Sequence, residues 1–155
     1  MHWSSLDPLA TVTPVLAIFP ISTGYKLMGL LHIVAAVVAF GPLLVYPTLK
    51  DAAPQRLAKL HMTITFPALV LLWVFGMGLA GMSDDAFKMS QTWLVLAIVD
   101  WAILMVVSFF LIKPAITDTT EGARAKFSAG VGVTHLGMIV GLILMIWKPG
   151  APAGF

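Results

Sequence analysis

The sequence contains no cysteine and few charged residues, and both shortages restrict what the protein can be. Without cysteine it forms no disulfide, no thiolate metal site and no thiol redox centre. Only 10% of its 155 residues are charged, whereas about a quarter are charged in soluble domains. It also lacks a phosphate-cradling glycine loop, a nucleophilic serine arrangement and a carboxylate pair. A hydrolase or an ATP-driven pump is therefore a poor interpretation.

What the sequence has instead is long apolar runs, since 59% of its residues are hydrophobic. About twenty apolar residues at a rise of 1.5 Å cross the hydrocarbon core of a bilayer. Runs of this length predict four spanning helices, over residues 26–47, 60–82, 92–112 and 127–147. Short connections between them predict an all-α membrane protein, an antiparallel four-transmembrane-helix bundle, with a bend at Gly41-Pro42 and polar links at 48–59 and 113–126.

The ends of the chain differ from this bundle. Prolines at positions 8, 14 and 20 interrupt the apolar N-terminus and exclude a regular spanning helix there. We therefore expect three parts: an irregular, extracytoplasmic or interfacial segment over residues 1–25, the bundle over 26–150, and a short tail over 151–155.

The distribution of basic residues predicts the orientation. Six of the nine Lys and Arg residues lie in the first and third connections, namely Lys50, Arg56, Lys59, Lys113, Arg124 and Lys126. Because basic loops stay on the cytoplasmic side, we expect a multi-pass protein of the bacterial inner membrane with both termini outside. The small net charge of +2 argues against binding to nucleic acid.

Ionisable side chains within the predicted helices are the candidate functional residues, because they are costly in a bilayer. A rise of 1.5 Å per residue places His32 about 10 Å, Asp100 about 13 Å and His135 about 18 Å below the outer boundary. Met28 and Met138 share helix faces with the two histidines. Imidazole with thioether suits haem iron or Cu(I), so His32 and His135 are the predicted metal ligands, Met28 and Met138 further cofactor-binding residues, and Asp100 an outer-shell partner or proton carrier.

Each of these residues also has a purely structural interpretation. Methionine fills irregular gaps in apolar cores, and a histidine or aspartate within a bundle often only hydrogen-bonds a neighbouring helix. A bundle that binds no cofactor is therefore an equal alternative. His61, close to Lys59 at the predicted cytoplasmic end, is interpreted as an interfacial residue.

Three stretches also carry a family resemblance: LLHIVAAVVAFGPLLVYPTLK, RLAKLHMTITFPALVLLWVFGMGLA and MIWKPG. Over residues 26–150 the chain resembles a bacterial family of predicted integral membrane proteins of unknown function, which groups with the CopD copper-resistance membrane proteins and the HemJ-type protoporphyrinogen oxidases. The resemblance implies that His32 binds haem b. Asp100 stands where those oxidases carry a basic residue or histidine, which argues against porphyrinogen oxidation.

Two functions from different classes follow. The first is a small membrane protein that binds haem b or copper in the outer half of the bundle. The second is a non-catalytic accessory subunit that packs in the lipid bilayer against a larger membrane complex or in a homo-oligomer. Proton or solute transport through Asp100 is a weaker third.

Overall fold

The structure is a computed structural model that describes residues 23–83 and 87–150. Within these ranges every regular element is a helix. Four continuous helical stretches are long and apolar enough to cross a membrane: Thr23–Ala52, Pro54–Gly81, Thr92–Ala115 and Glu121–Trp147. The prediction of four such helices is confirmed. The predicted interfacial segment, apart from residues 23–25, and the predicted tail lie outside the described residues.

Three of the four stretches contain a turn of altered helix geometry. The first consists of α1 (Thr23–Phe40), the 3₁₀ turn η1 (Gly41–Val45) and α2 (Tyr46–Ala52). The second consists of α3 (Pro54–Leu60), the π turn η2 (His61–Thr65) and α4 (Phe66–Gly81). The third consists of α5 (Thr92–Val106), the π turn η3 (Val107–Ile112) and α6 (Lys113–Ala115). The fourth, α7 (Glu121–Trp147), is a regular α-helix throughout.

Proline explains where these turns occur. A proline ring clashes with the carbonyl four residues earlier in a regular α-helix. Pro67 and Pro114 each stand two residues after the last residue of a π turn, η2 and η3 respectively, and a wider turn relieves that clash. Pro42 lies at the start of η1. The change of helix type therefore falls at the predicted Gly41-Pro42 position.

The helices extend further into the connections than the sequence indicated. The predicted polar link 48–59 is helical except at Ala53, whose φ and ψ are −155° and 65°. Pro54 disfavours helical geometry at Ala53 but suits the first turn of the next helix. α7 begins at Glu121 because the Thr120 hydroxyl accepts a hydrogen bond from the Ala123 N–H and caps it. Hydrophobicity alone makes the helices too short at these connections, because polar residues also form helices.

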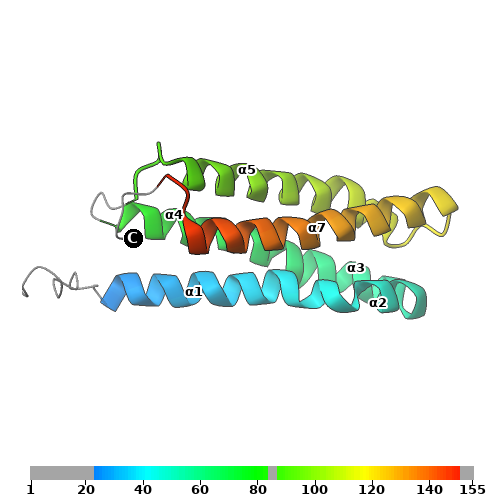
Figure 1. Ribbon diagram of the computed structural model, residues 1–155. Coiled ribbons are helices and arrows are strands. Elements are labelled where there is room, and N and C mark those ends of the chain that lie inside the picture. Colours follow the sequence, from blue (N-terminus) through cyan, green and yellow to red (C-terminus); the bar gives the residue numbers. More distant parts are fainter. Residues whose placement is uncertain (1–22, 84–86, 151–155) are drawn as a thin grey trace, which may run out of the picture.

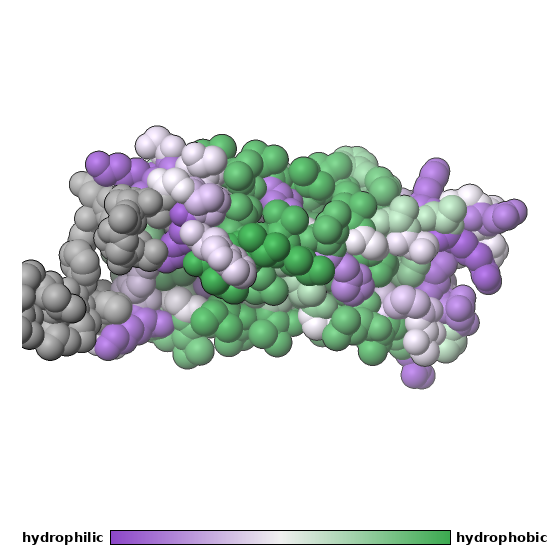
Figure 2. Space-filling view, viewed as in Figure 1, coloured by the Kyte–Doolittle hydropathy of each residue, from purple (hydrophilic) through white to green (hydrophobic). Residues whose placement is uncertain are grey.

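The helices lie side by side, and α1 packs mainly on α4 while α5 packs mainly on α7 (Figure 1). On the face seen in space-filling view, mainly apolar residues form a belt across the middle of the molecule, with hydrophilic residues at its two ends (Figure 2). One end carries the basic connections 48–59 and 113–126, and is called the basic end below.

The packed core is concentrated towards this basic end. Its largest cluster of buried side chains joins η1, α2, α3, η3, α6 and α7, and consists of Leu43, Tyr46, Leu57, Val107, Ile112, Ala115, Ile116, Ala123, Phe127 and Val131. A second, smaller cluster of Ala39, Ala68 and Leu69 lies further along, where α1 meets α4. The predicted ligand residues belong to neither cluster.

Candidate functional site

His32 and Met28 pack against two glycines of α4. The His32 Nδ1–H donates to the carbonyl of Leu72 at 3.0 Å. A Cβ at Gly76 would lie 3.1 Å from His32 Cε1, and a Cβ at Gly78 would lie 3.1 Å from the Met28 sulfur. The glycines therefore make room for the imidazole and the thioether where α1 meets α4. Small residues allow close helix approach in membranes, and here they accept the two predicted ligand side chains.

His135 is bound to its own helix. Its Nδ1–H donates to the Val131 carbonyl at 2.9 Å, and the side chain is half-buried, as is Met138 three residues later. Because a carbonyl oxygen only accepts hydrogen bonds, Nδ1 carries the proton in both His32 and His135. The lone pair of each neutral imidazole is then on Nε2, which has no hydrogen-bond partner within residues 23–83 and 87–150.

Asp100 lies between α5 and α7. A Cβ at Gly137 would lie 3.1 Å from its Oδ1, and one at Gly141 would lie 3.5 Å from its Oδ2. Gly137 and Gly141, four residues apart on α7, therefore leave space for the Asp100 carboxyl group and for Leu104. In the described part of the chain the Asp100 carboxyl makes no hydrogen bond and no ion pair, so the predicted bond to a histidine ring is not observed.

The predicted site residues thus occur on two helix pairs. His32 and Met28 belong to α1 packed on α4, whereas Asp100, His135 and Met138 belong to α5 packed on α7. Among the described residues no group of three or more His, Asp or Glu side chains is placed to hold a metal ion. The histidines remain single candidate ligands, each with a methionine nearby in sequence.

A second polar group, which the sequence analysis did not identify as a site, lies deep in the core at the basic end. The Tyr46 hydroxyl is 2.8 Å from Nδ1 of His61, and His61 Nε2 is 3.2 Å from the Ser108 carbonyl and 3.3 Å from its hydroxyl. Tyr46 and His61 are 0% exposed and Ser108 is 1% exposed. Since the carbonyl requires a proton on Nε2, the Tyr46 O–H must donate to Nδ1. His61 therefore uses both ring nitrogens and has none left for a metal.

The irregular turns of three helices bring this group together. Tyr46 directly follows the 3₁₀ turn η1, His61 begins the π turn η2, and Ser108 lies in the π turn η3. Thr65, one turn after His61, is also buried; its hydroxyl lies beside that of Tyr46 but makes no hydrogen bond of good geometry with any described residue. π turns are frequent at functional sites. The polar group of Tyr46, His61 and Ser108 contains residues of two π turns and joins three of the four helical stretches.

The interpretation of His61 as an interfacial residue is therefore wrong, because protein atoms cover it completely. The neighbouring Lys59 suggested an exposed position, yet the ring points to the opposite face of the helix. A usable signal was present: Leu57, His61, Thr65 and Ala68 recur at helical spacing and are all buried.

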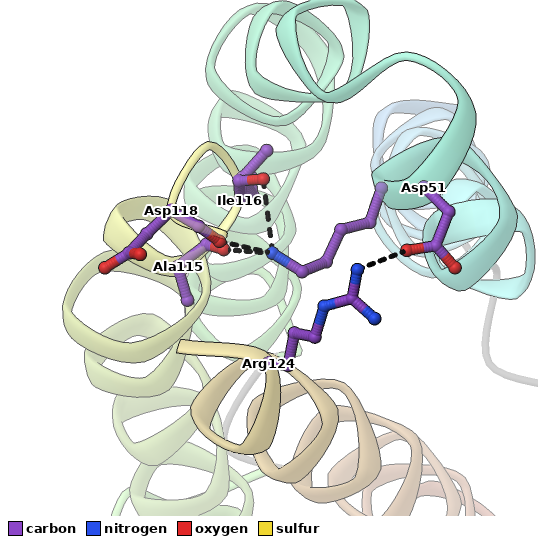
Figure 3. A network of polar contacts seen from close by, with 6 residues as sticks. Asp51, Ala115, Ile116, Asp118 and Arg124 are labelled. Carbon is purple, nitrogen blue, oxygen red and sulfur yellow. Dashed lines mark hydrogen bonds and ion pairs between the residues drawn. The ribbon is translucent and has the colours of Figure 1, made fainter. Parts of the chain in front are cut away.

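The third polar group closes the basic end itself (Figure 3). The Lys50 ammonium donates to the carbonyls of Ala115, Ile116 at 3.3 Å and Asp118 at 3.2 Å, and it lies 4.9 Å from the centre of the Phe127 ring. Carbonyls at a helix C-terminus lack intrahelical partners and favour a cation. Lys50 thus caps the third helical stretch from the first.

Asp118 shapes the turn that follows. Its carboxylate accepts the Thr120 N–H at 2.8 Å, and this bond, together with one to the Thr120 side chain, holds the pKa of Asp118 below its ordinary value. Thr120 in turn caps α7. The turn between the third and fourth stretches is therefore fixed by Lys50, Asp118 and Thr120, and the arrangement is structural.

Comparison with known proteins adds no assignment: no family model, no curated protein sequence and no solved structure matches this chain.

Proposed function

We propose that this chain is a small multi-pass protein of the bacterial inner membrane, an antiparallel four-helix bundle with its basic end in the cytoplasm and both termini outside. Support comes from the four long apolar helices, from the apolar belt between hydrophilic ends (Figure 2), and from the basic residues gathered at one end. A bilayer holds such basic connections on its cytoplasmic side. Residues exposed on the belt then contact lipid.

Within this bundle, the proposed function is to bind haem b or copper, with His32 and His135 as single candidate ligands on separate helix pairs. The observation that carries the proposal is the hydrogen bond from each Nδ1–H to a backbone carbonyl. Ligating histidines characteristically donate their other ring N–H in this way, which fixes the tautomer and directs the Nε2 lone pair at the metal. His61, with both nitrogens bonded, provides the contrast within the same protein.

The donor atoms fit some metal groups and not others. One imidazole can be the axial ligand of a haem iron, and one imidazole with a nearby thioether suits Cu(I). The Met28 sulfur and the His32 ring both pack on glycines of α4, as the combination of imidazole and thioether requires. A zinc site would need three or four nitrogen or oxygen ligands, and the described residues bring no such group together. The bound group would supply electron transfer, and the chain's own residues would hold and orient it.

Single-histidine variants test this proposal. The purified protein would be titrated with haemin, followed by its absorption spectrum, and separately with Cu(I) in competition with a coloured chelator. His32→Ala and His135→Ala remove the proposed ligands, and His2→Ala, outside the described residues, is the matched control. We expect at least about a ten-fold loss of affinity for a ligand variant and no change for His2→Ala. Equal behaviour of all three variants, or no binding by the parent, would overturn the proposal.

The alternative function, a non-catalytic accessory subunit of a larger membrane complex, stays a prediction with its own test. Extraction in a mild detergent followed by size-exclusion chromatography would show a defined complex or homo-oligomer, and a chain that is always monomeric would contradict it. The family resemblance stays a prediction as well, and the metal proposal does not depend on it.

A further inference from the structure

A hollow of about 230 Å³ lies at the basic end, between the first and fourth helical stretches. It is lined by Pro47, Lys50, Asp51, Arg124, Phe127, Ser128 and Val131. Its lining has two parts. Pro47, Phe127 and Val131 provide an apolar wall, and the remaining side chains are charged or hydroxylated. A hollow with both kinds of surface fits a ligand that is itself part polar and part apolar.

The two cations at the hollow differ in how they are engaged. The Lys50 ammonium already donates to three backbone carbonyls. Arg124 makes one long contact, 3.9 Å from Asp51, and its side chain is 66% exposed (Figure 3). A guanidinium has five N–H donors in a planar fork that matches phosphate oxygens. Arg124 therefore retains donors for an anion, and Ser128, one turn later on the same helix face, adds a hydroxyl.

The position of the hollow indicates the source of that anion. Its lining comes from the end of the first helical stretch and the first turns of α7, next to the basic connections 48–59 and 113–126. Pro47, on the apolar wall, is exposed at the surface of the molecule. The local charge is also favourable: the connections 48–59 and 113–126 hold six basic residues against Asp51, Asp118 and Glu121. Basic pockets on the cytoplasmic side of membrane helices bind anionic lipid headgroups.

We propose that this hollow binds an anionic phospholipid, with the phosphate at Arg124 and Ser128 and the acyl chains along Pro47 and Val131. The inference rests on the proposed membrane insertion, but not on metal binding. It gives Arg124 a role beyond the exposed ion pair with Asp51, which by itself contributes little to stability.

The test compares two arginines at the same end of the molecule. The parent, Arg124→Gln and Arg56→Gln would each be mixed in detergent with phosphatidylglycerol or phosphatidylcholine, and bound lipid measured by native mass spectrometry. Both variants lose one positive charge, but Arg56 does not line the hollow. We expect the parent and Arg56→Gln to prefer phosphatidylglycerol. Arg124→Gln should bind it about ten-fold less, since a hydrogen bond to a charged group is lost.

Two results of the lipid-binding experiment would contradict the proposal. Equal losses in both variants would show unspecific attraction to a basic surface and would overturn the proposal. So would displacement of the lipid by an equal concentration of inorganic phosphate, because the site would then recognise the phosphate alone. Unchanged helical circular dichroism confirms that Arg124→Gln is folded. If the chain does not fractionate with membranes at all, the proposed function fails first, and the two failures are thereby distinguished.

Discussion

Tyr46→Phe should destabilise the protein more than the loss of one hydroxyl normally does. The substitution keeps the ring that stacks on Phe127 but removes the donor to His61 Nδ1, which lies 2.8 Å away. That nitrogen is then an acceptor with no donor, in a side chain that is 0% exposed. Leaving a buried polar group unsatisfied costs about 1–3 kcal/mol.

Hydrogen bonds between membrane helices average less than this range, about 0.6 kcal/mol in double-mutant cycles. Tyr46 and His61 are both completely covered by protein atoms. We therefore expect Tyr46→Phe to lower the free energy of unfolding by about 2 kcal/mol, closer to the cost of an unsatisfied buried group. The assay is reversible unfolding by sodium dodecyl sulfate in mixed micelles, followed by circular dichroism. Combining Tyr46→Phe with His61→Leu should cost less than the sum of the two single changes, because the second removes the unsatisfied nitrogen.

The matched control is Thr63→Ala. Its hydroxyl is exposed and donates to the Lys59 carbonyl of its own helix at 2.8 Å, so its loss should change the free energy of unfolding by less than about 0.5 kcal/mol. If Tyr46→Phe is as mild as this control, or if the double variant is strictly additive, the buried group does not hold the helices together as described.

Three further predictions concern other parts of the molecule. Gly137→Ala should destabilise by about 1–2 kcal/mol in the same unfolding assay, because its Cβ would overlap side chains of α5, while Gly132→Ala, which meets open space, should be neutral or stabilising. Since the chain has no cysteine, single Thr119→Cys and Ser90→Cys variants should react with impermeant thiol reagents from opposite sides of the membrane; labelling from one side would refute the topology. Hydrogen bonds in the folded turn keep the pKa of Asp118 low, so its stabilising effect is complete above the ordinary carboxyl pKa and is lost as pH falls through the lowered value; Asp118→Asn should flatten this acid dependence of unfolding.

Hydrophobic runs were sufficient to predict the helices, because a bilayer leaves few alternatives to them. The four spans and the unusual backbone at Gly41-Pro42 were readable in this way. The ends of the helices could not be predicted in this way. Thr120 begins α7 by capping it and Pro54 begins α3 through its fixed φ, and both lie among polar residues that a hydropathy profile assigns to loops.

The candidate site was predicted in part. Residue type and depth singled out His32, His135 and Asp100, but depth along a helix says nothing about the direction in which a side chain points. Rotation of each helix is set by packing: the glycines of α4 and α7 accept His32 and Asp100 on different helix pairs. The Tyr46–His61–Ser108 group was missed for a related reason, since it depends on the contact between two π turns, and no single stretch of sequence shows that contact.

The most direct test of the proposed function is the cofactor content of the protein isolated from membranes of its own cells. Absorption spectra of the oxidised and reduced protein, with copper analysis of the same sample, would be recorded for the parent and His32→Ala. The account predicts about one haem or one copper ion per chain in the parent, and a clear loss in the variant. A colourless parent free of copper would contradict it.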